Sequence, residues 1–278
     1  MPELPEVETI VRDLSPRLRG RPLRNPQLFK TDVLRGVSSR RFLRVLRNNR
    51  IEDVTRRAKH VVILLASGER MVVQPRMTGS LIVYDRRLRE DERRHVVLRA
   101  TLGNGSTLVY RNVRRLGTIS LLDEVAWKAY TARIGPEPLT REFTSDRFIE
   151  QMLGTKQAIK KAIMDQRRVA GVGNIYANEA LFRAGIDPSR RTDLLSSGEL
   201  RRLYRTVRHV LRQAVRAGGT TVRDYRNGTG GTGSYQRTLL VYGRGGEHCT
   251  RCRTILTTTH TIDGRATTFC WRCQSVAR

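Results

Sequence analysis

The segment Met1-Pro2-Glu3-Leu4-Pro5-Glu6-Val7-Glu8 begins the chain, and the fold can be worked out from it. Pro5 suits the first position of a helix, and acidic residues suit its first turn because they face the positive end of the helix dipole. Four apolar side chains follow at helical spacing: Val7, Ile10, Val11 and Leu14. We therefore expect a helix from Pro5 to about Ser15, ended or kinked by Pro16, that anchors the first residues against a core.

The same segment contains a possible nucleophile. If Met1 is removed, Pro2 presents a secondary amine, with the carboxyl groups of Glu3 and Glu6 nearby along the backbone. An α-amino group titrates near pH ~8, so part of it is unprotonated at neutral pH and can form a Schiff base with a sugar aldehyde carbon. Taken alone, the segment is better explained as an ordinary helix start, and the rest of the chain must decide between the two interpretations.

The composition indicates a polyanionic partner. The 278 residues include 53 basic and 26 acidic side chains, for a formal net charge of +27. Nucleic acid is favoured over a membrane because the basic residues are spread through the whole chain. No apolar run reaches the length of a membrane span and no signal pattern precedes the first helix, so we expect a cytoplasmic protein without membrane contact.

The pattern along the chain predicts an α+β protein of several domains. From about residue 22 to 122, short apolar runs separated by turn signals predict an antiparallel β-sandwich or barrel, with hairpins at 61–74 and 96–110. The segment Ile134–Pro138 is the candidate hinge. The predicted divisions are a β-sandwich domain at 1–132, a hinge at 133–144, a helical domain at 145–234 and a cysteine-containing hairpin at 235–278.

Four helices are expected after the hinge, and a glycine-rich segment follows them. The helix ranges are Ser145–Leu153, Lys156–Asp165, Asn174–Ala184 and Ser196–Ala217, the last with a capping box of Ser196 and Glu199. The segment between Gly218 and Ser234 has six glycines, which suits either a linker or a loop that orders on substrate.

Four cysteines near the end of the chain have the spacing of a metal site. Cys249 and Cys252 form one Cys-x2-Cys pair, and Cys270 and Cys273 form a second after seventeen intervening residues. This pattern is typical of a four-thiolate zinc site, which has no open position for catalytic water. We therefore expect one structural Zn²⁺; two disulfides are the weaker alternative, because nothing else indicates an oxidising compartment.

Several motifs together resemble one enzyme family. They are Met1-Pro2-Glu3-Leu4-Pro5-Glu6-Val7-Glu8-Thr9, Arg57-Ala58-Lys59-His60, Gln157-Ala158-Ile159-Lys160, Gly171-Val172-Gly173-Asn174-Ile175-Tyr176-Ala177, Val241-Tyr242-Gly243-Arg244, and the cysteine quartet with Gly264-Arg265-Ala266-Thr267. As a set they resemble the formamidopyrimidine-DNA glycosylase and endonuclease VIII family. The opening motif is similar to the formamidopyrimidine-DNA glycosylase branch.

The resemblance implies catalytic roles for residues near the N-terminus. Pro2 matches the family's nucleophile, which attacks C1′ of a damaged nucleotide, expels the base and promotes β- and δ-elimination. Glu3 matches the residue that handles protons at the opened sugar, Glu6 a supporting carboxylate, and Lys59 a lysine near the lesion phosphate and the elimination chemistry. Arg265 is counted with this catalytic group and also matches a phosphate contact.

The resemblance also implies a set of DNA contacts. Lys160, Asn174 and Tyr242 match residues that hold phosphates beside a flipped nucleotide. Met77 and Arg114 match side chains inserted into the hole that the flipped base leaves, and Leu116 stands where the third inserted residue is usually phenylalanine. His95 is included among the candidate DNA contacts, although the five histidines form no ligand or triad pattern and otherwise suit structural or surface positions.

The expected function is therefore a bifunctional DNA glycosylase and abasic-site lyase of base excision repair. The resemblance implies a helix-two-turn-helix in the helical domain, damaged double-stranded DNA as the partner, bound across a basic cleft, and oxidised purines as the substrates; a monomer is expected. The glycine-rich segment, beginning at 221–225, falls where relatives carry a loop that closes over an everted oxidised guanine. Two alternatives remain: an endonuclease VIII-like enzyme for oxidised pyrimidines, and a zinc-finger DNA-binding protein without catalysis.

Overall fold

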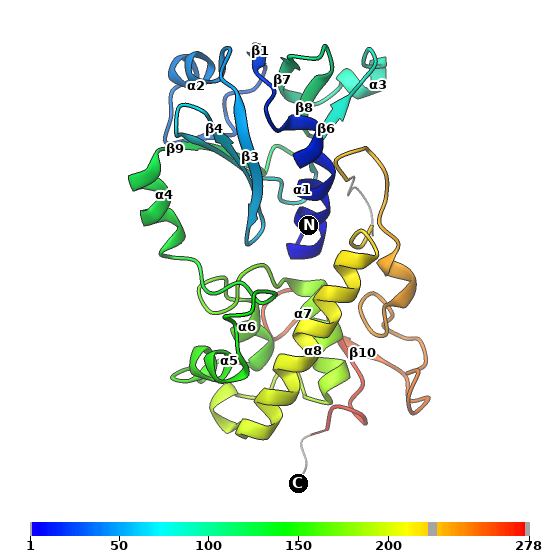
Figure 1. The fold of residues 1–278 in the computed structure, drawn as a ribbon. Coiled ribbons are helices and arrows are strands. Elements are labelled where there is room, and N and C mark those ends of the chain that lie inside the picture. The colour runs from blue at the N-terminus through cyan, green and yellow to red at the C-terminus, as the bar shows by residue number, and fades with distance from the viewer. Residues whose placement is uncertain (1, 222–226, 276–278) are drawn as a thin grey trace. The chain divides into compact units, whose positions relative to one another are not determined.

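The computed structural model describes residues 2–221 and 227–275. The chain forms two compact units (Figure 1). The first comprises Met1–Ala132 and Ala217–Ser234, and the second comprises Arg133–Arg216 and Tyr235–Arg278.

The first unit is built on two β-sheets. One has the strand order β1-β7-β8-β6, with β1 Leu23–Leu28, β7 Val96–Leu102, β8 Thr107–Asn112 and β6 Gly79–Tyr84. The other has the order β2-β9-β5-β4-β3, with β2 Leu34–Arg35, β9 Thr118–Leu122, β5 Arg70–Gln74, β4 His60–Leu65 and β3 Ile51–Arg57. Apolar side chains from both sheets and from α1 (Leu4–Leu18) form one core. The predicted sandwich and both predicted hairpins are confirmed.

The antiparallel prediction fails at one short pair, because β2 pairs with β9 in parallel. Three helices of this unit were also not predicted: α2 Ser39–Leu46, α3 Glu90–Arg93 and α4 Glu124–Thr131. The expected end of α1 near Pro16 is wrong, since the helix continues to Leu18. Pro16 lies in the last turn, where it removes one backbone donor, and the complete burial of Leu14 and Leu18 offsets that loss.

The second unit is mainly helical. It contains α5 Ser145–Met152, α6 Ile159–Met164, α7 Asn174–Ala184, α8 Ser197–Arg216, the short 3₁₀ segments Thr192–Leu194 and Tyr235–Thr238, and a hairpin of β10 Thr257–Thr259 and β11 Thr267–Phe269. The four predicted helices are present, and the Ser196–Glu199 capping box is formed in both directions at the start of α8. The α+β fold with a cysteine-bearing hairpin is confirmed.

Residues 217–221 and 227–234, which were expected in the helical domain, belong to the first unit. The reason is a set of hydrogen bonds to α1: Thr220 N donates to Glu6 Oε1 at 2.7 Å and Gly228 N to Asp13 Oδ2 at 3.1 Å. Residues 222–226, which include most of the stretch 221–225 that begins the predicted lesion-capping segment, lie outside the described residues.

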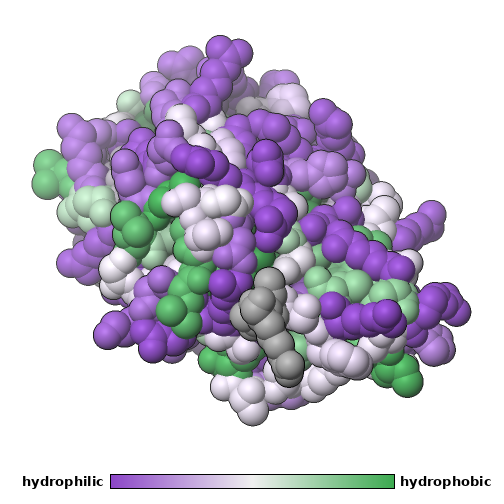
Figure 2. Space-filling view, turned by 90° about the horizontal axis from the view of Figure 1, so that it is seen from below, coloured by the Kyte–Doolittle hydropathy of each residue, from purple (hydrophilic) through white to green (hydrophobic). Residues whose placement is uncertain are grey.

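The surface reflects the composition. Hydrophilic side chains cover most of the face in Figure 2, with apolar side chains scattered among them. Within residues 2–221 and 227–275, no helix has the length and apolar character needed to cross a membrane.

Candidate functional site

The N-terminus of α1 places the first candidate catalytic residues in the first unit. Pro2 is buried, and Glu3 and Glu6 are 2% and 1% exposed. The Glu6 carboxylate accepts hydrogen bonds from the backbone N–H of Glu3 at 2.8 Å and from that of Thr220 at 2.7 Å. One carboxylate therefore fixes both the residue after Pro2 and the beginning of the glycine-rich segment.

Gly219 makes this arrangement possible. Its φ of +83° lies in the left-handed region, and a Cβ there would lie 2.9 Å from Glu6 Oε1. A side chain at this position would be strained and would displace the carboxylate. The glycine thus has a positional role beside Glu6 that its occurrence in a glycine-rich run did not reveal.

Lys59 lies in the tight turn between β3 and β4 and is 8% exposed. The turn is strained, because Ala58 has a φ of 51°, a conformation that residues other than glycine rarely adopt. Arg56 stabilises it: its Nη1 donates to Ala58 O at 3.0 Å while its Nε donates to Glu8 Oε2 at 2.9 Å. Because Glu8 belongs to α1, Arg56 links the helix that carries Pro2 to the turn that carries Lys59.

His60 and Tyr130 hold the other side of this turn. His60 Nδ1 lies 3.0 Å from Arg57 O, and His60 Nε2 lies 2.9 Å from the Tyr130 hydroxyl. A neutral imidazole with its proton on Nδ1 satisfies both contacts, donating to the carbonyl and accepting from the phenol. Burial lowers the pKa of His60 to about 4, and the cationic Arg57, Lys59 and Arg76 lower it further, against the hydrogen bond to Arg57 O, which raises it.

The buried His60 predicts an acid-sensitive fold in the first unit. Its ordinary pKa is 6.5, so below that pH the unfolded chain takes up a proton that the folded chain refuses until about pH 4. The free energy of unfolding should therefore fall as pH falls from 6.5 to 4, and His60→Gln should reduce that slope. Urea denaturation of both proteins across this range measures the difference. Identical slopes would show that the imidazole does not titrate as its burial implies.

Two loops bring the candidate inserted residues together. Met77 and Arg114 are exposed, and Arg114 Nη1 lies 3.5 Å from Met77 Sδ. Thr78 joins the loops, since its hydroxyl donates to Asn112 Oδ1 and accepts from Arg114 N, both at 3.0 Å. Leu116 is also exposed, at 43%.

His95 lies close to these loops along the backbone. Its side chain is exposed, its φ is 61°, and its carbonyl accepts a hydrogen bond from Asn112 N at 3.0 Å. Its predicted contact with DNA stays a prediction, as do the roles of Met77, Arg114 and Leu116.

In the second unit, Lys160 is completely buried. Its ammonium donates to Asp263 Oδ1 at 3.1 Å and to Thr267 Oγ1 at 2.6 Å. Asp263 also accepts from Arg265 N at 3.1 Å. Lys160 thus fixes the loop between β10 and β11 that presents the exposed Arg265. This positioning role was not expected from the sequence, which predicted a phosphate contact for Lys160.

Asn174 and Tyr242 are each held by backbone contacts in the same unit. Asn174 Nδ2 donates to Ala266 O at 3.0 Å, which brings the start of α7 to the Arg265 loop. Tyr242 N donates to Glu179 Oε1 at 3.0 Å. Their phosphate contacts remain predictions.

Glu179 and Asn178 are buried positioning residues that the sequence did not reveal. The fully buried Glu179 carboxylate accepts from three consecutive backbone N–H groups, of Leu240, Val241 and Tyr242, at 2.9–3.0 Å. Asn178 Oδ1 accepts from Thr268 N at 2.8 Å. The available signal was a polar pair within the otherwise apolar centre of α7, where burial requires a hydrogen-bonding partner.

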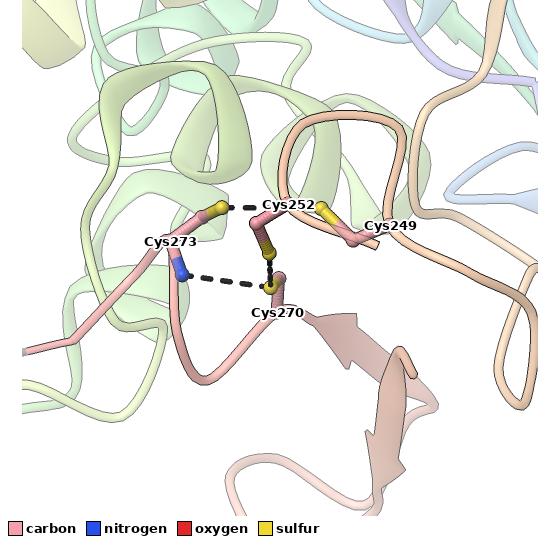
Figure 3. Close-up of side chains that lie close together, drawn as sticks. All are labelled: Cys249, Cys252, Cys270 and Cys273. Carbon is pink, nitrogen blue, oxygen red and sulfur yellow. Dashed lines mark hydrogen bonds between the residues drawn. The ribbon is translucent and has the colours of Figure 1, made fainter. Parts of the chain in front are cut away.

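The four cysteines converge, with the ligand sulfur atoms all within 4.8 Å of one another (Figure 3). Cys249 and Cys252 precede β10, and Cys270 and Cys273 follow β11. The Cys249–Cys273 and Cys252–Cys270 sulfur distances are 3.9 and 3.5 Å. A tetrahedron with metal–sulfur bonds of about 2.3 Å requires sulfur separations of about 3.8 Å, so the quartet fits a bound metal ion.

Comparison with known proteins matches both units. Residues 1–119 match the model of the formamidopyrimidine-DNA glycosylase N-terminal domain, and residues 134–226 match that of its H2TH domain. The chain is 40% identical over 277 residues to a formamidopyrimidine-DNA glycosylase of Heliobacterium modesticaldum, covering 99% of this chain and 100% of the relative. It belongs to the formamidopyrimidine-DNA glycosylase family. The expected family is therefore confirmed, and with it a DNA glycosylase activity.

Solved structures of relatives have the same fold. The protein of Thermus thermophilus superposes with a TM-score of 0.87 at 34% identity, covering all of both chains. The Lactococcus lactis protein, in a complex with DNA containing an abasic site, gives 0.89 at 30% identity, covering 99% of this chain and all of that chain. A mutant of the same protein in complex with Fapy-dG-containing DNA gives 0.89 at 30% identity with the same coverage.

Proposed function

We propose that this member of the formamidopyrimidine-DNA glycosylase family binds damaged duplex DNA, excises oxidised purines and cleaves the resulting abasic site. The observation that supports this most directly is the connection between α1 and the Lys59 turn. Glu6 fixes the backbone next to Pro2, and the Glu8–Arg56 pair ties the same helix to the Lys59 turn. A helix start without a catalytic role has no need of a lysine held in a strained turn beside it.

The chemistry follows from these groups once Met1 has been removed. The Pro2 amine bonds to C1′ and loses its proton as the bond from C1′ to the base breaks, and the base leaves with a proton. The C1′–O4′ bond then breaks to give an iminium, and Glu3 handles the proton that the freed O4′ takes up. The resulting iminium makes the neighbouring C–H acidic, so the 3′ and then the 5′ phosphate leave by β- and δ-elimination, with Lys59 near the lesion phosphate. The DNA grip expected of Lys160, Asn174, Tyr242 and Arg265 suits an enzyme that must extrude its target nucleotide.

We propose that the cysteine quartet binds one structural Zn²⁺. Four thiolates whose sulfur atoms all lie within 4.8 Å of one another, with two pairs at 3.9 and 3.5 Å, suit this ion and leave no position for catalytic water. The ion would join the two ends of the hairpin whose loop presents Arg265.

Borohydride trapping tests the function. Duplexes with 8-oxoguanine, a formamidopyrimidine, thymine glycol or no lesion are incubated with the full chain and reduced. We expect covalent adducts with the first two, and intact mass should show that the protein lacks Met1. Adducts mainly with thymine glycol would support oxidised pyrimidines instead. No adduct with any lesion would contradict the assigned chemistry.

Leu116→Phe should alter the choice of the base opposite the lesion. Leu116 is exposed beside the loop of Arg114, and leucine cannot stack on a base as phenylalanine does. We expect the ratio of cleavage rates between two opposite bases to change by about three- to tenfold, the scale of one aromatic contact. Cleavage of a preformed abasic site serves as the internal control and should change less. Equal changes in both reactions would argue against an inserted residue at this position.

A further inference from the structure

A hollow on the first unit is lined, apart from His95, by residues that have no role assigned above. It consists of two adjoining parts of about 320 and 560 Å³ that share Leu88, Arg93 and Arg99. One wall is the face of β1 and β7, and the other is the segment between β6 and β7. We call it the outer groove.

The outer groove is lined by cations and by no acidic side chain. Its basic residues are Lys30, Arg87, Arg93 and Arg99. Among the described residues none of these four has an ion-pair partner. A neighbouring hollow provides the contrast, because there Arg17 pairs with Asp85 and Arg86 with Glu92. A high net charge alone therefore does not explain the unpaired cations, which fit a polyanion.

The groove also has groups that suit a base. Phe29 is 49% exposed, and the Arg99 guanidinium lies over its ring at 5.6 Å from the centroid. Uncharged polar side chains line the rest: Asn25, Gln27, Thr101 and Thr107. The pairing of β1 with β7 shifts register between Arg24 and Gln27, where Asn25 has a φ of 45°. Cations for phosphates combined with an exposed ring are typical of surfaces that bind single-stranded nucleic acid.

One end of the groove adjoins the loops that carry Met77 and Arg114. His95 lines the larger part of the groove, and its carbonyl accepts a hydrogen bond from Asn112 N. The side chain of Asn112 accepts a hydrogen bond from the Thr78 hydroxyl, and that hydroxyl accepts one from Arg114 N. A strand that contacts these loops can therefore continue into the groove without leaving the first unit.

We propose that the outer groove binds a single-stranded extension of the DNA, with phosphates on its arginines and a base on Phe29. Concavity favours a single strand, because a duplex keeps its bases stacked inside and offers no ring to Phe29. This inference rests on the proposed function, since the extension is placed relative to the lesion-contacting loops.

Binding of fluorescent oligonucleotides tests the groove. The probes are a blunt lesion duplex and the same duplex with a single-stranded thymidine extension at one or the other end. We expect one extension to tighten binding by about tenfold, from stacking of one base and a few phosphate contacts. The variant F29A/R93Q/R99Q should lose this gain while cleaving the blunt duplex at the wild-type rate. The single variant Arg93→Gln changes an exposed residue and should lose part of the gain in affinity. It tests the groove even if the triple variant does not fold.

The control variant R40Q/R44Q removes two charges from exposed positions of α2 and should keep the gain. Equal affinity of the wild type for blunt and extended duplexes would overturn the proposal, as would an equal gain from a double-stranded extension. If R40Q/R44Q also lost the gain in affinity from the extension, net charge alone would explain that gain and the proposal would be overturned. If the wild-type protein did not cleave the blunt lesion duplex, the result would contradict the proposed function. The gain in affinity from the extension is measured by binding alone, so it tests the groove independently.

Discussion

A chain with one glycine inserted between Met1 and Pro2 is expected to lose borohydride trapping and strand cleavage by about a thousandfold or more. In this variant the Pro2 nitrogen is an amide, which is neither basic nor nucleophilic, and the new terminal amine is displaced by one residue. The hydrogen bonds that hold α1 use Glu3 N and the Glu6 carboxylate, not the nitrogen of Pro2. The fold should therefore persist while the chemistry is lost.

The measurement is single-turnover cleavage of an 8-oxoguanine duplex, with intact mass to establish the N-terminal residue. A matched control carries the same glycine after Ser275, the last described residue, and should remain active. Thermal unfolding and binding to a blunt duplex should match the wild type in both variants. If the variant with the inserted glycine still formed the covalent adduct, the nucleophile would be another amine, and Lys59 would be the first candidate to test.

Local sequence was enough to predict the elements whose stability is decided locally. The stripe of Val7, Ile10 and Leu14 predicted α1, and the Ser196–Glu199 pair predicted the start of α8. The pairing of β2 with β9 was not predictable in this way. It consists of two residue pairs about 85 positions apart, so only the tertiary packing around them decides it.

In the candidate site, too, local sequence predicts some features and only the tertiary structure shows the others. Residue types and spacing singled out Pro2 and the cysteines, and the family resemblance added Lys59, but neither showed what holds these residues in place. The bond from Thr220 to Glu6 spans 214 positions, and the pairing of Lys160 with Asp263 spans 103. A surface lysine and a buried lysine look alike in a sequence. Only burial reveals that Lys160 has an internal partner.

Removal of the metal proposed for the cysteine quartet is expected to unfold the hairpin of the second unit and to weaken DNA binding by about a hundredfold. Its strands have three residues each, too few to be stable alone, so metal binding and folding should be coupled. Cys249 and Cys270 are buried with Phe182, Val241 and Leu256, and loss of the metal would open this apolar cluster. The Arg265 loop would lose its support.

The buried Lys160 links loss of the hairpin to a defined cost in stability. When the loop leaves, the buried ammonium loses Asp263 and Thr267, and an uncompensated buried charge costs about 3–5 kcal/mol. Lys160→Met should therefore resemble metal removal in its effect on DNA binding while retaining the metal. A Trp127→Phe background isolates the emission of Trp271, which adjoins Cys270 and reports on the hairpin. Chelation should shift this emission and Zn²⁺ should restore it, with one zinc per chain by elemental analysis. Unchanged DNA affinity in the metal-free protein would separate the hairpin from the DNA grip and refute this coupling.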